Sequence, residues 1–496
     1  MTRSITHPGQ LHAVIHQFRV FALIGGPLLA AVVFWLVPDT ATGLDGGEIA
    51  IGTPGRITAA LASWMALWWL TEAVSIYATA LLPLALLPLG GASNITTTAQ
   101  AYAHPLIFLF MGGFILALAL EKWHLHRRFA LGVLRLVGTK PATLVGGFMF
   151  VAAAMSMWIT NTATTLVMLP ILLSVIALLD SDAPNRENFS LCLLLGVAYS
   201  ASIGGIGTIV GTVPNMFTVS FIQRELGMDI SFIRWMSFSL PLVVLFVPLT
   251  WWLLTRWLFP PGDQAVDGAL LREPREPWTL GAKLTLVIFL LTASSWIARP
   301  LLVKTPLLEG LSDTGIAIIA ALLLFIVPVN LKQREFLIDW ETALKLPWGI
   351  LLLFGGGLAL AGAIRSTGVG ELLAVQLAGV HGVPPLVLTL LVVTLIIFLT
   401  ELTSNTATTT ALVPIFAVMA QGLGINPLAI IIPATIAASC AFMLPVATPP
   451  NAIVFGSNLI RIPQMARAGF WLNLLGILLI SLTMHLILGL DPALGH

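Results

Sequence analysis

The sequence predicts an all-α polytopic membrane protein with about eleven transmembrane helices and two further helical segments that carry a repeated polar motif. Only 45 of the 496 residues are charged, 23 Lys or Arg and 22 Asp or Glu, and 58% are hydrophobic. So few charges cannot cover a water-soluble surface. The apolar residues form runs that approach the ~20 needed for a transmembrane helix, without the ~10-residue alternation of a membrane β-barrel.

Eleven apolar runs bounded by polar residues, Gly or Pro are expected to cross the membrane. They are residues 19–37, 57–72, 74–90, 104–121, 188–222, 232–258, 280–299, 310–329, 347–363, 427–460 and 468–490. Two other long segments, 141–180 and 385–420, have polar motifs at their centres, WITNTATTLV (158–167) and ELTSNTATTT (401–410). Each of these two segments forms either a re-entrant hairpin or two full crossings, and both alternatives leave the neighbouring loops on the same sides.

The positive charges are distributed unequally between the two predicted sides of the membrane. With the spans above, 17 of the 23 Lys and Arg residues fall on the side of the N-terminus and 6 on the other. Because cytoplasmic loops carry the excess of Lys and Arg, we expect the N-terminus in the cytoplasm and the C-terminus outside. The localisation that follows is a multi-pass protein of the cell inner, or plasma, membrane.

The chain contains an inverted repeat. FLFMGGFILALALEK (108–122) resembles LLLFGGGLALAGAIR (351–365), and each precedes a motif segment and then a helix interrupted by Gly or Pro. Those interruptions, GGIGTIVGTVPN (204–215) and MLPVATPPN (443–451), both end in Pro-Asn. An odd number of crossings separates the copies, so the second enters from the opposite face. Transporters with such repeats bind their substrates near the midplane, between discontinuous helices.

The polar residues of the two copies favour a cation site in each half. Irregular backbone at membrane depth occurs where it is buried in protein or lines a wet cavity. Hydroxyl, amide and carbonyl oxygens suit a hard cation such as Na⁺. The oxygens are expected from Ser156, Thr160, Asn161 and Gly211 in the first half and from Thr400, Thr403, Asn405 and Ala447 in the second.

Other readings of the same residues are weaker. One Asn motif by itself is more typical of a hydrogen bond between helices than of a ligand site, but two motifs in equivalent places favour binding. Glu401, which is expected within the membrane, fits a structural and a functional role equally well. Cys192 and Cys440 are too few for a disulfide framework or a metal site. We find no basic cluster for nucleic acid, no ATP-binding loop and no catalytic constellation, so the chain is predicted not to be an enzyme.

With these features the chain resembles the divalent anion/sodium symporter family, which includes bacterial dicarboxylate carriers. The likeness rests on the paired motifs Thr160-Asn161-Thr162 and Ser404-Asn405-Thr406, and on WWLTEAVS (68–75), YSASIGGIGTIVGTVPN (199–215) and ATPPN (447–451). It implies re-entrant hairpins and a homodimer in which a transport domain slides past a scaffold, the elevator mechanism. The implied scaffold is 1–140 and 223–384, with a linker at 259–279, and the implied transport domain is 141–222 and 385–460, followed by a C-terminal helix in 461–496.

The resemblance also implies the ligands. One Na⁺ would lie in each half, so at least two in all, held by the two residue sets given above. The substrate carboxylates would contact Asn161, Thr162, Thr212, Asn405, Thr406, Thr448 and Pro449. This sequence departs from the family pattern in two places, with Thr160 where Ser is usual and Val213 where Pro is often found.

The expected function is sodium-coupled import of C4-dicarboxylates such as succinate, malate or fumarate by an elevator mechanism. The expected partners are therefore a small dicarboxylate, the lipid bilayer and a second copy of the chain. Three alternatives stay open on the sequence: a sodium-independent anion exchanger, sodium-coupled transport of citrate or sulfate, and a passive channel.

Overall fold

The computed structural model describes residues 8–43, 47–129, 132, 138–179, 185–263, 277–377 and 384–490. Within these ranges the regular structure is helical except for two short antiparallel ribbons. The ribbons pair β1 (Thr40–Thr42) with β2 (Glu48–Ala50) and β3 (Pro328–Asn330) with β4 (Glu335–Phe336).

The described chain contains six α-helices as far as Lys122. They are α1 (Pro8–Leu36), α2 (Gly52–Thr71), α3 (Ile76–Thr79), α4 (Leu82–Leu89), α5 (Ile95–Gln100) and α6 (Pro105–Lys122). The single span predicted over 74–90 is divided into the two short helices α3 and α4. Pro83 has no N–H to bond to the carbonyl of Thr79, so one hydrogen-bond ladder cannot run through both.

The first copy of the repeat is a helical hairpin followed by an interrupted helix. Its helices are α8 (Pro141–Ser156), α9 (Asn161–Ala177), α10 (Arg186–Gly205) and α11 (Val213–Glu225). The chain then forms α12 (Phe232–Trp252), which continues as a π-helical turn at Leu253–Leu258. The predicted segment 141–180 is thus two antiparallel arms with the motif at their junction, and the predicted span 188–222 is broken at its glycines.

The second copy has the same order, and five described α-helices lie between α12 and its hairpin. These are α13 (Leu280–Leu302), α14 (Asp313–Ile326), the short α15 (Trp340–Ala343), α16 (Trp348–Ser366) and α17 (Val369–Leu377). The hairpin is α18 (Pro385–Thr400) and α19 (Asn405–Gly422), the interrupted helix is α20 (Leu428–Ala438) and α21 (Pro449–Phe455), and α22 (Ile462–Leu490) ends the described chain.

Seven helical segments in the described ranges are long and apolar enough to cross a membrane. They are Arg19–Leu36, Ile95–Lys122, Arg186–Gly205, Phe232–Leu258, Leu280–Leu302, Trp348–Ser366 and Ile462–Ile487. The remaining predicted spans consist of helices that are shorter or less apolar, and the hairpin arms are among the shorter apolar helices. The chain is therefore an all-α polytopic membrane protein.

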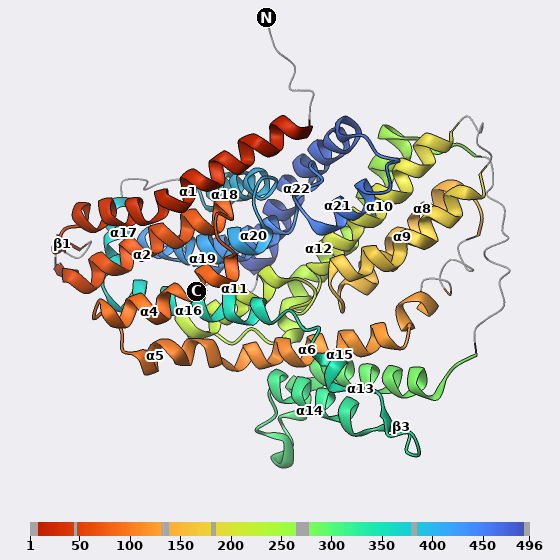
Figure 1. Cartoon of the computed structure of the whole chain (residues 1–496), viewed down its shortest axis with the longest axis horizontal. Helices are drawn as coiled ribbons and strands as arrows, with labels where there is room; N and C mark the ends of the chain where they lie inside the picture. The colour runs from red at the N-terminus through yellow and green to blue at the C-terminus, as the bar shows by residue number, and fades with distance from the viewer. Residues whose placement is uncertain are drawn as a thin grey trace, which may run out of the picture.

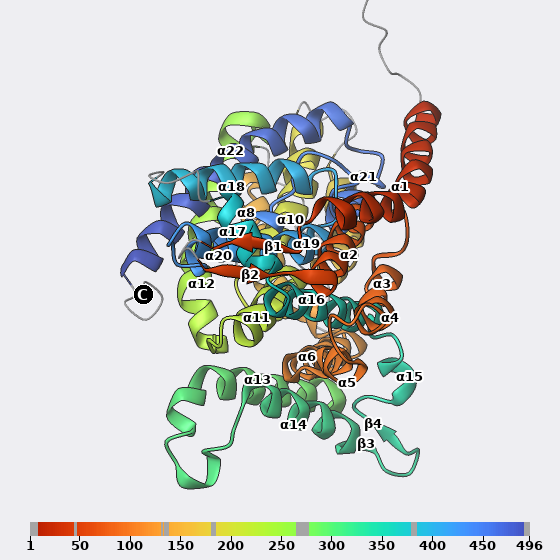
Figure 2. The same cartoon turned by 90° about the vertical axis from the view of Figure 1, so that its left-hand side faces the viewer.

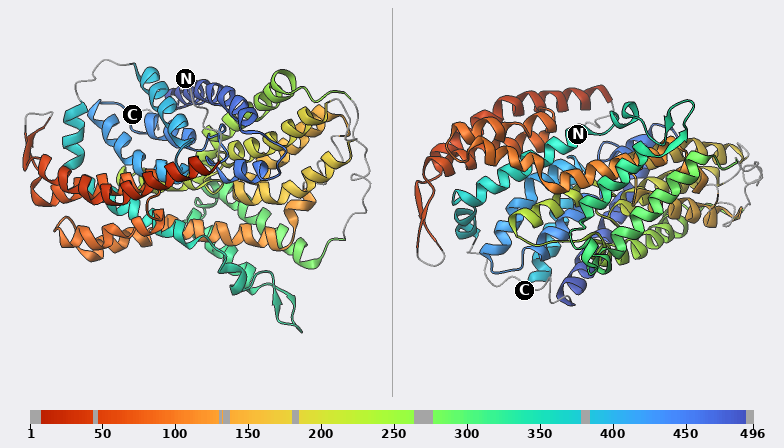
Figure 3. Two further views of the ribbon diagram at one scale, coloured as in Figure 1. Left: turned by 45° about the horizontal axis from the view of Figure 1, so that its top comes forward. Right: turned by 90° about the horizontal axis from the view of Figure 1, so that it is seen from below.

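The two repeats interlock around a shared core. The β1–β2 ribbon lies at one end of the molecule and the α8–α9 hairpin at the other (Figures 1 and 3). Helices α13 and α14 form a layer beyond α6, which packs on α14 (Figure 2). Across the pseudo-symmetry, α21 packs on α9 and α11 packs on α19. Each interrupted helix thus contacts the hairpin of the other repeat.

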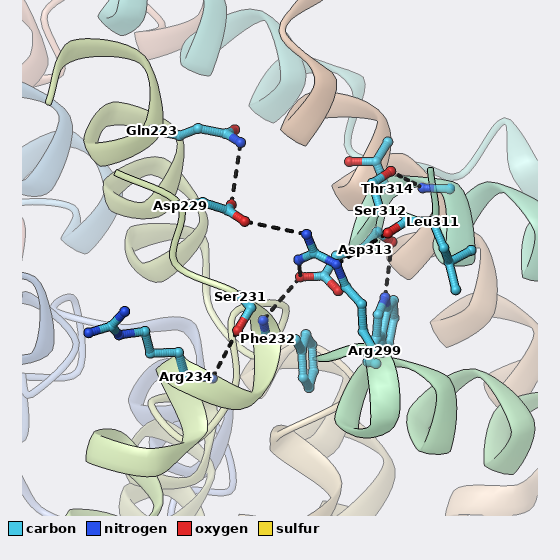
Figure 4. A network of polar contacts seen from close by, with 12 residues as sticks. Gln223, Asp229, Ser231, Phe232, Arg234, Arg299, Leu311, Ser312, Asp313 and Thr314 are labelled. Atoms are coloured by element: carbon cyan, nitrogen blue, oxygen red, sulfur yellow. Dashed lines mark hydrogen bonds and ion pairs between the residues drawn. The ribbon is translucent and has the colours of Figure 1, made fainter. Parts of the chain in front are cut away.

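An ion network joins the α11–α12 connection to the α13–α14 pair (Figure 4). The Arg299 guanidinium lies 3.0 Å from Asp313 Oδ2 through Nη1 and 3.3 Å from Asp229 Oδ2 through Nη2. Asp313 Oδ2 also accepts a hydrogen bond from the Phe232 backbone N–H at 3.1 Å. Asp313 is buried, so this network ties the first residue of α12 to the first residue of α14.

Candidate functional site

The two hairpin tips are built alike. Four residues separate the arms in each, 157–160 in the first hairpin and 401–404 in the second, and the second arm begins with the motif asparagine, Asn161 or Asn405. The Thr160 hydroxyl caps α9 by accepting a hydrogen bond from the Ala163 N–H at 3.2 Å. Ser404, at the same position of α19, makes no such bond. Each tip therefore presents the positive end of a helix dipole beside an amide and hydroxyls.

The two breaks are also built alike. The first break is residues 206–212, between α10 and α11, and the second is residues 439–448, between α20 and α21. Thr212 and Thr448 each occupy the position before the helix that follows the break, with backbone angles φ −147°, ψ 149° and φ −142°, ψ 149°. The Thr448 hydroxyl accepts a hydrogen bond from the Asn451 N–H, and the Thr212 hydroxyl makes no such capping bond. Both residues are buried. The close agreement of these angles confirms that the Pro-Asn endings identified in the sequence mark equivalent points of the repeat.

The asparagine after each break proline acts as a clamp that sequence reasoning did not assign. Asn215 Nδ2 lies 3.0 Å from the Gly205 carbonyl oxygen and 2.8 Å from that of Thr208. Asn451 Nδ2 donates to the carbonyl oxygens of Ala441 and Leu444 at 3.2 and 3.0 Å. The carbonyls freed by each break are thus bonded by one side chain, as a buried backbone requires. The shared Pro-Asn ending was the sequence signal for this role.

At Gly211 the backbone itself requires glycine. A Cβ added there would overlap the carbonyl oxygen of Gly205 across the break. The equivalent position of the second half is occupied by Ala447, which is buried. The sequence predicted small residues at both positions, and the structure shows that only the first is restricted to glycine.

One cavity of about 1730 Å³ lies between the two tips and the two breaks. It is lined by residues from both halves of the repeat, although these are far apart in the sequence. Of the predicted ligands, it brings together Thr160, Asn161, Thr162, Gly211, Thr212, Thr403, Asn405, Thr406, Ala447, Thr448 and Pro449.

Two predicted cation ligands, Ser156 and Thr400, do not line this cavity and lie fully buried behind the tips. The Thr400 hydroxyl lies 2.8 Å from Asn405 Oδ1 and 2.9 Å from the Ala438 carbonyl oxygen. The Ser156 hydroxyl has no hydrogen-bond partner among the described residues. An unpartnered buried hydroxyl is costly, and an ion at the tip would supply the missing contact.

The mouth of the cavity is charged. Arg19, Glu72, Glu121 and Lys345 line it, and the Arg19 and Glu72 side chains form an ion pair at 3.3 Å. All four belong to the side that carries the excess of Lys and Arg in the sequence. On the predicted topology, these charged lining residues, Glu72 among them, belong to the cytoplasmic side of the cavity.

The predicted ligands that line the cavity supply neutral oxygens. In the described parts of the chain, no group of three or more His, Cys, Asp or Glu residues could hold a transition metal. Hydroxyl, amide and carbonyl oxygens fit an alkali cation. The two helix N-termini and the threonine hydroxyls fit an anion.

The chain matches the family described as the sodium:sulfate symporter transmembrane region over residues 27–490. It is 39% identical over 491 residues to the sodium-dependent dicarboxylate transporter SdcS of Staphylococcus saprophyticus, an alignment that covers 96% of this chain and 92% of that protein. To SdcS of Staphylococcus aureus it is 40% identical over 455 residues, with 88% of this chain and 87% of that protein covered.

A solved structure has the same fold. The YdaH transporter of Alcanivorax borkumensis superimposes with a TM-score of 0.61 over 97% of this chain and 100% of that chain, at 18% identity. The predicted family and the prediction that the chain is not an enzyme are confirmed. The repeated hairpins, the interrupted helices and the matched relatives lead to one conclusion: the chain belongs to the sodium:sulfate symporter family of membrane transporters, the divalent anion/sodium symporters.

Proposed function

We propose that the chain is a sodium-coupled symporter that imports C4-dicarboxylates such as succinate, malate or fumarate across the plasma membrane. The observation that carries the proposal is the single cavity lined by both asparagine motifs and both breaks. The similar staphylococcal proteins are named sodium-dependent dicarboxylate transporters, which supports sodium as the coupling ion and a dicarboxylate as the substrate.

Each half would hold one Na⁺ at its tip and break. The first set is Ser156, Thr160, Asn161 and Gly211, and the second is Thr400, Thr403, Asn405 and Ala447. The unpartnered Ser156 hydroxyl supports the first set, and the contact of Thr400 with Asn405 supports the second. These oxygens would replace part of the hydration shell of the ion.

The substrate would lie between the tips. Its carboxylates would be held by Asn161, Thr162, Thr212, Asn405, Thr406, Thr448 and Pro449, which all line the cavity. None of these residues is cationic, so the helix N-termini and the bound Na⁺ would provide the positive field. Binding of Na⁺ and of the dianion would therefore favour each other reciprocally.

Transport would proceed by an elevator motion of the two hairpins and interrupted helices, 141–222 and 385–460, against the rest of a homodimer. Helix α22 packs on α18 and α20, and α12 packs on α8. These contacts connect the two ranges to α12 and α22, which lie outside them. The charged residues that line the cavity belong to the side predicted to be cytoplasmic, which supports an inward-facing conformation. The proposed orientation has the N-terminus in the cytoplasm and the C-terminus outside.

The test is uptake of labelled succinate into proteoliposomes with an inward Na⁺ gradient or with choline. Wild-type protein is expected to accumulate succinate only with Na⁺. Each net positive charge moved across 100 mV contributes about 2.3 kcal/mol, so a negative interior potential is expected to increase uptake if Na⁺ charge exceeds substrate charge. Asn405→Ala is expected to abolish the Na⁺-dependent component, whereas Asn330→Ala, in the β3–β4 ribbon outside the cavity lining, keeps it.

The same assay separates the alternatives. Equal uptake in Na⁺ and choline would overturn symport, and a requirement for internal dicarboxylate would identify an exchanger. Competition by a panel of unlabelled succinate, citrate and sulfate identifies the substrate. Saturable accumulation against a gradient excludes a passive channel.

A further inference from the structure

Glu401 is a buried acid at the tip of the second hairpin. It follows Thr400 directly, precedes Asn405 by four residues across the tip, and is 4% exposed. The other carboxylates on the described hairpins and interrupted helices, Glu187 and Glu225, lie in the first turn of α10 and at the last residue of α11. Glu401 is therefore the acidic group that this part of the described chain brings to a tip.

The Glu401 carboxylate binds the backbone of the second break, residues 439–448. Its Oε1 accepts from the N–H groups of Phe442 and Met443 at 2.7 and 2.9 Å. Its Oε2 accepts from those of Met443 and Leu444 at 3.0 and 3.2 Å. Three consecutive amides of the break thus point at one carboxylate, and hydrogen bonds to an ionised group are about twice as strong as neutral ones.

Helix α22 holds the same segment from the other side. A Cβ at Gly469 would overlap the carbonyl group of Phe442, so α22 packs directly on the backbone of the break. Asn473, four residues later on the same helical face, donates from Nδ2 to Glu401 Oε1 at 2.9 Å. The break is therefore held between the hairpin tip and α22.

These contacts continue into the second proposed cation site. Thr400, next to Glu401, contacts both Asn405 Oδ1 and the Ala438 carbonyl oxygen at the end of α20. Ala447 follows the last amide bound by Glu401 by three residues. The tip, the break and the proposed ligands are thus one connected unit with Glu401 at its junction.

Among the described residues, the tip of the first hairpin has no such charge. Met157 precedes Asn161 by four residues, as Glu401 precedes Asn405. There the tip is joined to its break by one neutral hydrogen bond, from the Thr208 hydroxyl to the Met157 backbone carbonyl. The two proposed sites have similar neutral ligands, but only the second has a carboxylate behind it.

We infer that Glu401 is a positioning residue for the second cation site, an inference that rests on the proposed function. Its carboxylate holds the break so that the carbonyls around Ala447 face the ion. Its negative charge also offsets part of the positive charge that an ion brings into a site of neutral oxygens, where charges interact more strongly than in water. Na⁺ affinity at this site depends on the Glu401 carboxylate.

The experiment measures Na⁺ binding to the full-length purified protein without transport. The melting temperature is recorded at increasing NaCl concentrations, and choline chloride holds the ionic strength constant. Because Na⁺ binding stabilises the folded protein, the melting temperature rises with NaCl. The Na⁺ midpoint is the NaCl concentration at which half of this rise is reached. E401Q is expected to raise that midpoint by at least about tenfold, within the range of coupling between linked sites. The matched control E335Q makes the same change on an exposed strand and leaves the midpoint unchanged.

Two outcomes contradict the inference. If Glu401 only stabilises the fold, E401Q lowers the melting temperature equally at every NaCl concentration and leaves the midpoint unchanged. E401D keeps the charge but shortens the side chain by one methylene, so its midpoint is expected to lie between those of wild type and E401Q. A wild-type midpoint in E401D overturns the positioning role even if E401Q cannot be purified.

Failure of the proposed function gives a different result. A Glu401-dependent Na⁺ midpoint without Na⁺-driven succinate uptake would overturn symport and leave the inference standing. Na⁺-driven succinate uptake by the wild type, together with an unchanged Na⁺ midpoint in E401Q, would support symport and overturn the inference about Glu401.

Discussion

The asparagine clamp at the second break allows a prediction whose magnitude follows from the structure. In Asn451→Ala, the carbonyl oxygens of Ala441 and Leu444 lose their side-chain donor, and the clamp residue is fully buried. Each buried polar group left unpaired destabilises the fold by about 1–3 kcal/mol, so two of them amount to about 2–6 kcal/mol. We expect a loss of unfolding free energy in that range.

The assay is denaturant unfolding of purified protein at fixed detergent and Na⁺ concentrations. The unfolding free energies of variant and wild type are compared with the same dependence of free energy on denaturant concentration, the m-value. Asn188→Ala is the matched control, because Asn188 Nδ2 also donates to one carbonyl, that of Pro260 at 3.1 Å, but at an exposed position. Water replaces that bond, so the loss is expected to stay below about 1 kcal/mol.

A variant of the same shape separates the hydrogen bonds from packing. Asn451→Asp fills the same volume but directs an oxygen at the two carbonyl oxygens, so it is also expected to be strongly destabilised. A loss in Asn451→Ala no larger than in Asn188→Ala, or a stable Asn451→Asp, would show that the clamp reasoning is wrong.

Three other predictions follow from the fold and the site. Gly211→Ala is expected to reduce Na⁺-driven uptake by about tenfold or more, because the added Cβ overlaps the Gly205 carbonyl oxygen and such overpacking costs about 1–3 kcal/mol. The control Ala447→Gly forces no atom to move and is expected to reduce uptake much less. Arg299→Met removes the cationic partner of the buried Asp313 carboxylate. It is expected to lower the unfolding free energy by about 3 kcal/mol, measured by denaturant titration. The hydrogen bond from Lys122 lowers the pKa of Asp339 from 3.8 to about 2, so the stabilisation from this pair is complete above about pH 4 and is lost as the pH falls toward 2. The difference in melting temperature between wild type and Asp339→Asn is therefore expected to shrink between pH 6 and pH 2.5, and a constant difference would contradict it.

Much of the candidate site could be predicted because polar residues, Gly and Pro mark the places where apolar helices begin, end or break. Asn161 and Asn405 begin the second arms of the hairpins where the sequence places its polar motifs, and the helices break at the glycines and prolines before Asn215 and Asn451. A helix in an apolar surrounding needs every backbone group bonded, so a polar or Pro-containing interruption is visible in the sequence itself.

The sequence by itself thus determined the membrane class, the inverted repeat and the positions of the two polar motifs and the two interrupted helices, and eleven of the predicted ligands line the cavity. The tertiary structure alone decided that Ser156 and Thr400 lie behind the tips, that 74–90 is two helices, and that Glu401 binds three amides of the break near residue 443. These features depend on contacts between segments distant in the chain. Periodicity and composition describe which face or segment is polar, but only packing decides which distant donor satisfies a given buried acceptor.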